Sequence, residues 1–144
     1  MASNSIAHIV SPFKFMLLLM NIMLVISICH MRDEFIYSGL RVEYGSSSQE
    51  YKDADTQFIV CLTLFLVCNC LQLLIVFLGI NLFLDVTNMI LSFIHAAGVL
   101  SLYSYIMNSW THGFMWNLFI PFGVFPLLLE GVMCFYSWSH FKID

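Results

Sequence analysis

The stretch FMWNLFIPFGVFPLLLEGVMCFYSW, residues 114–138, is almost wholly apolar and contains a single charged residue, Glu130. A helix needs roughly 20 such residues to cross a membrane, because the hydrocarbon core is about 30 Å thick and a helix rises about 1.5 Å per residue. The stretch is therefore predicted to be a transmembrane helix. A carboxylate inside it is costly unless it has a partner, so Glu130 is expected to face other helices.

Three other stretches meet the same criterion, at residues 13–30, 57–79 and 87–108. Their side chains do not alternate between apolar and polar, as the strands of a membrane barrel would, so helices are expected. The connections between the second, third and fourth spans are short, and consecutive helices must then run antiparallel. We predict an all-α membrane protein, a four-helix antiparallel transmembrane bundle that forms a single membrane domain over residues 1–144.

Composition supports this class and excludes others. The chain is 60% hydrophobic and only 10% charged, against about 25% charged residues in an ordinary globular protein. A net charge of −4 provides no basic surface for nucleic acid. Cys68 and Cys70 lack the C-x-x-C spacing of a redox pair. The histidines lack ligand spacing, so we predict no metal site and no cofactor.

Residues 31–56 form the only sizeable polar segment and are expected to be a loop between the first two helices. It holds three basic and six acidic residues. Its last part leads directly into the second helix, and an acidic run there is often no more than a solvated face. We instead predict an interaction surface that Glu50→Gly would weaken, made of Glu50, Tyr51, Asp53 and Asp55.

Charge leaves the orientation in the membrane open. The positive-inside rule counts Lys and Arg, and the loop holds one more than the terminal side: Arg32, Arg41 and Lys52 against Lys14 and Lys142. That difference favours a cytoplasmic loop only weakly. A cleaved signal peptide is a further alternative for the first helix, since Lys14 precedes the apolar residues 15–28.

Polar residues inside the four spans fall at one depth. Counted from the same membrane face, each lies 7 or 8 residues in, roughly 11 to 12 Å at helical rise; they are Asn21, Gln72, His95 and Glu130. Such groups normally face the bundle interior and pair. We expect Glu130 to meet His95, its neighbour across the short 109–113 connection.

This polar layer has two interpretations. In the first, a buried His–Glu pair relays protons or ions. In the second, hydrogen bonds of about 0.6 kcal/mol each determine which helix faces which. We favour the second, because the outer halves of the helices hold few polar residues that would complete a path. Glu130→Gln should then be tolerated, whereas Glu130→Leu should loosen helix pairing by about 1 kcal/mol.

Two prolines in the fourth span, Pro121 and Pro126, are predicted to bend it, because each removes a backbone donor and crowds the carbonyl four residues earlier. Small residues in the third and fourth spans would allow either a contact within the bundle or the close approach of another helix. They are Ala96, Ala97, Gly98, Gly123 and Gly131.

Several short patterns occur together in collinear order over nearly the whole chain. They are Arg32-Asp33 after the first helix, Glu50-Tyr51 with Asp53, Asp55 and Gln57, His95, Trp110 and Trp116 spaced by six, and Pro126-x-x-x-Glu130. In this combination the chain resembles the transmembrane protein 107 family, four-helix membrane proteins of the ciliary transition zone.

The resemblance implies a non-enzymatic scaffold of the Meckel syndrome module with cytoplasmic termini. It would recruit or retain tectonic, B9-domain and C2-domain coiled-coil proteins, and support cilium assembly and the ciliary membrane diffusion barrier. Lipid is the expected surrounding, and no small-molecule substrate is implied. The alternative from the residues themselves is a small proton or ion transporter, or a channel accessory subunit, that uses the His–Glu layer.

Overall fold

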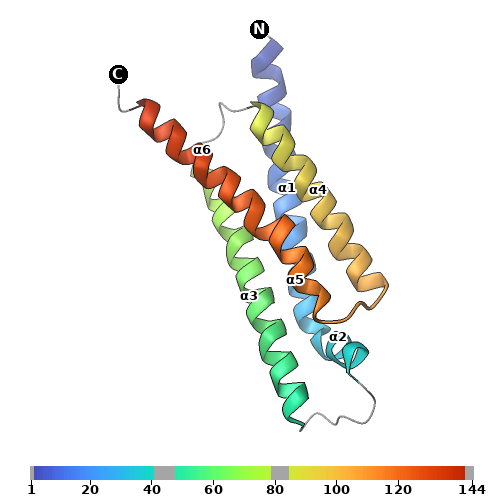
Figure 1. Cartoon of the computed structure of the whole chain (residues 1–144). Coiled ribbons are helices and arrows are strands. Elements are labelled where there is room, and N and C mark those ends of the chain that lie inside the picture. The colour runs from blue at the N-terminus through green and yellow to red at the C-terminus, as the bar shows by residue number, and fades with distance from the viewer. Residues whose placement is uncertain (1, 41–47, 79–84, 142–144) are drawn as a thin grey trace.

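A computed structural model describes residues 2–40, 48–78 and 85–141. The described chain is a bundle of helices without strands, in which α1 begins and α6 ends at one end and α2 lies at the opposite end (Figure 1). The elements are α1 (Ala2–His30), α2 (Arg32–Gly39), α3 (Gln49–Leu78), α4 (Asp85–Met107), α5 (Phe114–Phe119), the π-helix η1 (Ile120–Val124) and α6 (Phe125–Phe141).

Within these residues, four helical stretches are long and apolar enough to cross a membrane. They are Ser11–His30, Gln49–Leu78, Val86–Met107 and Phe114–Ser139. Figure 1 shows them running side by side in alternating directions. The predicted fold class, a four-helix antiparallel transmembrane bundle, is therefore confirmed.

The polar segment 31–56 is more ordered than a loop. Arg32–Gly39 forms α2, and α3 begins at Gln49, whereas the predicted second span begins at residue 57. Ser48 caps α3, because its Oγ accepts a hydrogen bond from the backbone N–H of Tyr51 at 3.3 Å. A hydropathy window detects only the part of a helix that is apolar, so it missed the polar first turns of α3.

Aromatic packing holds α2 against the bundle. Phe35 of α2 is buried, and its ring lies 4.8 Å from the ring of Tyr105 in α4 and 6.2 Å from that of Phe58 in α3, centroid to centroid. The backbone N–H of His112 also donates to the carbonyl of Phe35 at 3.3 Å. At this end of the bundle, α2 therefore covers the hydrophobic core between α3 and α4.

The fourth span is continuous but irregular at its centre. Its π-helical segment contains Pro121 and ends where the N–H of Phe125 bonds the carbonyl of Ile120, five residues back. Pro121 has no N–H with which to bond Asn117, so the regular α-helical ladder is interrupted there. Pro126 follows as the second residue of α6. One predicted bend site, Pro121, thus lies inside the π-helical turn, and the other, Pro126, follows directly after it.

Candidate functional site: a buried polar cluster and a membrane-surface cap

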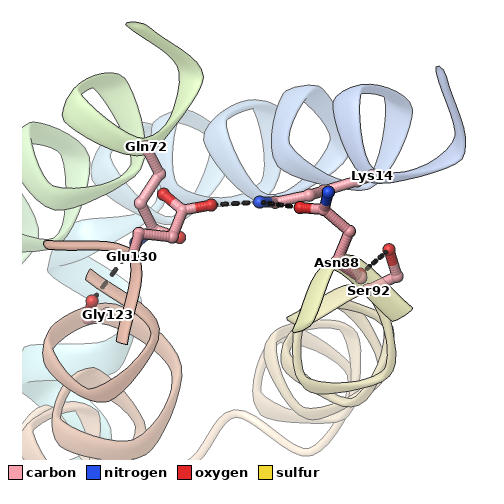
Figure 2. Close-up of polar contacts among 6 residues, drawn as sticks. All are labelled: Lys14, Gln72, Asn88, Ser92, Gly123 and Glu130. Atoms are coloured by element: carbon pink, nitrogen blue, oxygen red, sulfur yellow. Dashed lines mark hydrogen bonds and ion pairs between the residues drawn. The ribbon is translucent and has the colours of Figure 1, made fainter. Parts of the chain in front are cut away.

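Lys14 and Glu130 form an ion pair inside the bundle. Their exposed fractions are 1% and 0%, and the Lys14 ammonium contacts one oxygen of the Glu130 carboxylate (Figure 2). The same ammonium donates to Asn88 Oδ1 at 3.3 Å. Ser92, one turn further along α4, donates from its hydroxyl to the Asn88 backbone carbonyl at 2.8 Å. The pair therefore joins α1, α4 and α6 near the end of the bundle where α1 begins.

The predicted contact between Glu130 and His95 is wrong. Glu130 meets Lys14 instead, and both ring nitrogens of His95 lack a hydrogen-bond partner among the described residues. A lysine near the start of a span is easily interpreted as a flanking charge in the headgroup region. Here its stem lies along the helix interface, where the opposite charge of Glu130 offsets the cost of burying both groups.

All four residues of the predicted polar layer are buried. Asn21 donates from its amide to the backbone carbonyl of His95 at 3.4 Å, which links α1 to α4. Gln72 donates to the backbone carbonyl of Gly123 at 3.3 Å, which links α3 to η1 (Figure 2). The layer residues thus bond to backbone groups of neighbouring helices, and no hydrogen bond between their own side chains occurs in the described part of the chain.

Besides Lys14, three buried polar residues of the described chain were not assigned to the predicted layer: Asn69, Asn88 and Ser92. Asn88 lies near the start of α4 and was not assigned to the layer. Asn69 is buried in α3 and donates to the carbonyl of Phe65 in the same helix at 2.8 Å. Both are amide side chains inside the predicted spans, so their polar character was the signal that could have identified them.

Several buried polar atoms keep unused hydrogen-bonding capacity. Among the described residues, the atoms without a partner include Asn21 Oδ1, Gln72 Oε1, Glu130 Oε2 and both ring nitrogens of His95. No group of three or more His, Cys, Asp or Glu residues in the described ranges is placed to hold a metal ion. The contacts that the described buried polar residues make are hydrogen bonds and one ion pair.

The opposite end carries a second polar cluster, which we call the cap: Arg32, Asp33, Tyr37, Tyr51 and Asp55. The Tyr51 hydroxyl donates to Asp33 at 2.7 Å, and the rings of Tyr37 and Tyr51 lie 5.2 Å apart. The Arg32 Nε lies 3.7 Å from both Asp33 and Asp55. The cap therefore attaches α2 to the first turns of α3.

The four predicted interaction residues divide between two environments. Tyr51 and Asp55 belong to the cap, whereas Glu50 and Asp53 are exposed. Asp53 accepts a hydrogen bond from the Gln49 amide one turn earlier at 2.8 Å. Of the four, Glu50 and Asp53 are thus the carboxylates that face outward.

His112 lies in the connection between α4 and α5 and packs against the end of α2. Its Nδ1 is buried without a hydrogen-bond partner in the described residues, and its ring lies against Gly39. A Cβ at position 39 would lie 2.9 Å from that nitrogen, so this contact requires glycine. Burial lowers the pKa of His112 below its usual value, because the imidazolium would lose its hydration.

Two of the five small residues of the third and fourth spans, Gly98 and Gly123, pack inside the bundle. A Cβ at Gly98 would lie 3.3 Å from Phe122, and one at Gly123 would lie 2.9 Å from Phe119 and 3.1 Å from Phe65. A Cβ at Gly131, in contrast, would meet no atom within 4 Å. Gly98 and Gly123 therefore permit close internal packing.

Comparison with known proteins identifies the family of the chain. The family model TMEM107, described as a transmembrane protein, matches residues 10–134. Transmembrane protein 107 of Danio rerio is 25% identical over 119 residues, which cover 83% of this chain and 87% of the relative. No solved structure matches the chain. Because the family model covers most of the sequence and the described residues form four potential spans, the chain belongs to the transmembrane protein 107 family of multi-pass membrane proteins.

Proposed function

We propose that the protein is a non-enzymatic membrane scaffold of the ciliary transition zone. It recruits or retains proteins of the Meckel syndrome module, namely tectonic, B9-domain and C2-domain coiled-coil proteins. Through them it supports cilium assembly and the diffusion barrier of the ciliary membrane. Membership of the transmembrane protein 107 family is the first support for this proposal.

The main structural support for the proposal is that the buried polar side chains make contacts between neighbouring helices. Lys14 and Glu130 neutralise each other, and Asn21 and Gln72 donate to backbone carbonyls of adjacent helices. These contacts determine helix pairing, as the structural interpretation of the polar layer requires. A relay through a direct His95–Glu130 contact is not supported, since Glu130 contacts Lys14 instead.

The outward carboxylates provide a surface for partners. Glu34, Glu50 and Asp53 are exposed on α2 and the first turns of α3. The cap contacts hold these two helices together, so the carboxylates are presented from an ordered surface. In the proposed orientation both termini are cytoplasmic, and this surface faces the other side of the membrane.

Localisation tests the proposal directly. A tagged copy in a ciliated cell should concentrate at the proximal base of the cilium and co-purify with other transition-zone proteins. Enrichment elsewhere, with the tagged protein folded and abundant, would contradict the scaffold role.

The alternative function is transport of protons or ions. A measurement of proton permeability in liposomes distinguishes it from a scaffold role. Purified protein in liposomes should leave the proton permeability equal to that of empty liposomes. A proton flux above that of empty liposomes would favour the transporter.

A further inference from the structure

A groove of about 150 Å³ lies between α1 and α3. Its surface is almost entirely apolar, and its lining includes Ile26, Cys29 and His30 of α1 with Ile59, Thr63 and Leu66 of α3. Ile26, Cys29 and Thr63 are exposed at the bundle surface. Because both helices are membrane spans, this surface faces lipid chains rather than water.

One end of the groove coincides with the charged cap. On α1 the lining ends at His30, two residues before Arg32. On α3 it ends at Ile59, one turn after Asp55. Arg32 Nε lies 3.7 Å from Asp33 and from Asp55. An apolar groove therefore ends close to a cation that is paired with two carboxylates.

We propose that this groove binds one acyl chain of a zwitterionic phospholipid, whose headgroup lies on the cap. The lipid phosphate lies at Arg32, and the choline or ethanolamine nitrogen lies against Asp33 and Asp55. A purely anionic headgroup fits less well, because both carboxylates would repel the charge that Arg32 attracts.

The dimensions favour a lipid chain over a helix. A helix with its side chains is about 10–12 Å across, far wider than a groove of about 150 Å³ can enclose. An acyl chain has the width of a single methylene and matches the apolar lining. A second copy of this chain or a partner helix would instead need a broad face.

Native mass spectrometry of the full-length protein tests the proposal. The protein in detergent is titrated with phosphatidylcholine, phosphatidylethanolamine or phosphatidylglycerol, and the bound fraction is measured at each concentration. One phosphatidylcholine or phosphatidylethanolamine should bind at least about fivefold more tightly than phosphatidylglycerol. Equal binding of all three would overturn the proposed headgroup site.

Variants assign the binding to this groove. Thr63→Phe fills it and should weaken phosphatidylcholine binding at least about fivefold, whereas Leu64→Phe, an exposed neighbour outside the lining, should not. The double variant Asp33→Asn with Asp55→Asn should remove the difference between zwitterionic and anionic lipids while the groove stays open, because the two carboxylates cause that difference. This variant tests the headgroup site even if Thr63→Phe fails to fold.

Two results would overturn the assignment. Unchanged lipid binding in Thr63→Phe, at a normal elution volume, would show that lipid binds elsewhere. A dimer in the spectra that Thr63→Phe dissociates would assign the groove to a second copy of the chain. The readout is lipid binding in vitro, so the outcome does not depend on the proposed ciliary role.

Discussion

Among single residues, Lys14 and Glu130 make the most consequential contact, the ion pair in the interior. Both side chains are buried, and the pair connects helices that begin and end the chain. Removing one partner from a buried pair leaves an uncompensated charge and is strongly destabilising, whereas replacing both by apolar residues is often tolerated. The tolerance expected for Glu130→Gln rested on His95 as the partner and no longer holds.

We therefore expect Glu130→Gln and Lys14→Met each to lower the free energy of unfolding by about 3–5 kcal/mol. The double variant Lys14→Met with Glu130→Gln should recover most of that loss, because neither buried charge remains. The measurement is denaturation of the purified protein in detergent micelles, followed by circular dichroism. Losses that simply add in the double variant would show that the two residues are not coupled.

His112 gives a prediction on pH. Its pKa is lowered by burial, so the folded protein binds fewer protons than the unfolded chain as pH falls through the usual range, about 6.5. Stability is retained above that range and should decline below it. His112→Asn, which does not titrate there, should show a smaller decline between about pH 7.5 and 5. Stability is measured by thermal unfolding at both pH values. An equal loss of stability in the wild-type protein and in His112→Asn would contradict this role.

Among the helical elements, the fourth span depends on glycine at its π-helical turn. A Cβ at Gly123 would lie 2.9 Å from the Phe119 ring and 3.1 Å from the Phe65 ring. The Gln72 amide also bonds the Gly123 carbonyl, so displacement of this turn would disturb a second contact. The π-helical turn is thus held by packing and hydrogen bonding together.

Gly123→Ala should accordingly destabilise the protein by about 1–3 kcal/mol through overpacking. Gly131→Ala is the matched control in the same span, because its added methyl meets nothing within 4 Å. That control should be neutral or stabilising by up to about 1 kcal/mol, the helix propensity of alanine over glycine. Unfolding in detergent measures both, and equal effects would argue against the packing explanation.

Across the whole molecule, the bundle has a neutralised polar interior at one end and an ordered acidic surface at the other. The first joins α1, α4 and α6, and the second presents exposed carboxylates on α2 and the first turns of α3. The cap lies on α2 and the start of α3, whereas the Lys14–Glu130 pair and Asn88 lie toward the end of the bundle where α4 begins. A change at the cap surface should therefore affect attachment without disturbing the interior.

Glu50→Gly is expected to weaken co-purification with transition-zone proteins at equal protein level. Because glycine also lowers helix propensity by about 1 kcal/mol, two further variants separate the causes. Gln57→Gly introduces glycine at an exposed site of the same helix and keeps the Glu50 charge. Glu50→Gln removes the charge and keeps a helix-forming residue. If the charge matters, Glu50→Gln weakens attachment and Gln57→Gly does not; the reverse pattern would attribute the effect to α3 stability.

The class of fold and the burial of the four predicted layer residues followed from the sequence alone. Lipid cannot hydrogen-bond the backbone, so long apolar stretches become helices. Lipid also disfavours polar side chains, so Asn21, Gln72, His95 and Glu130 are all buried as expected. Both inferences depend only on the properties of membrane lipid. They do not require knowledge of how each helix is rotated about its axis.

Which groups meet became known only from the packed bundle. Helix rotation and the length of the lysine stem bring Lys14 rather than His95 to Glu130. The segment 31–56 was expected to be a loop, but much of it forms α2 and the start of α3. Ser48 caps α3, and the aromatic contacts of Phe35 hold α2 against the bundle. These outcomes depend on distances between residues far apart in the chain, and hydropathy and spacing along one helix contain no such distances.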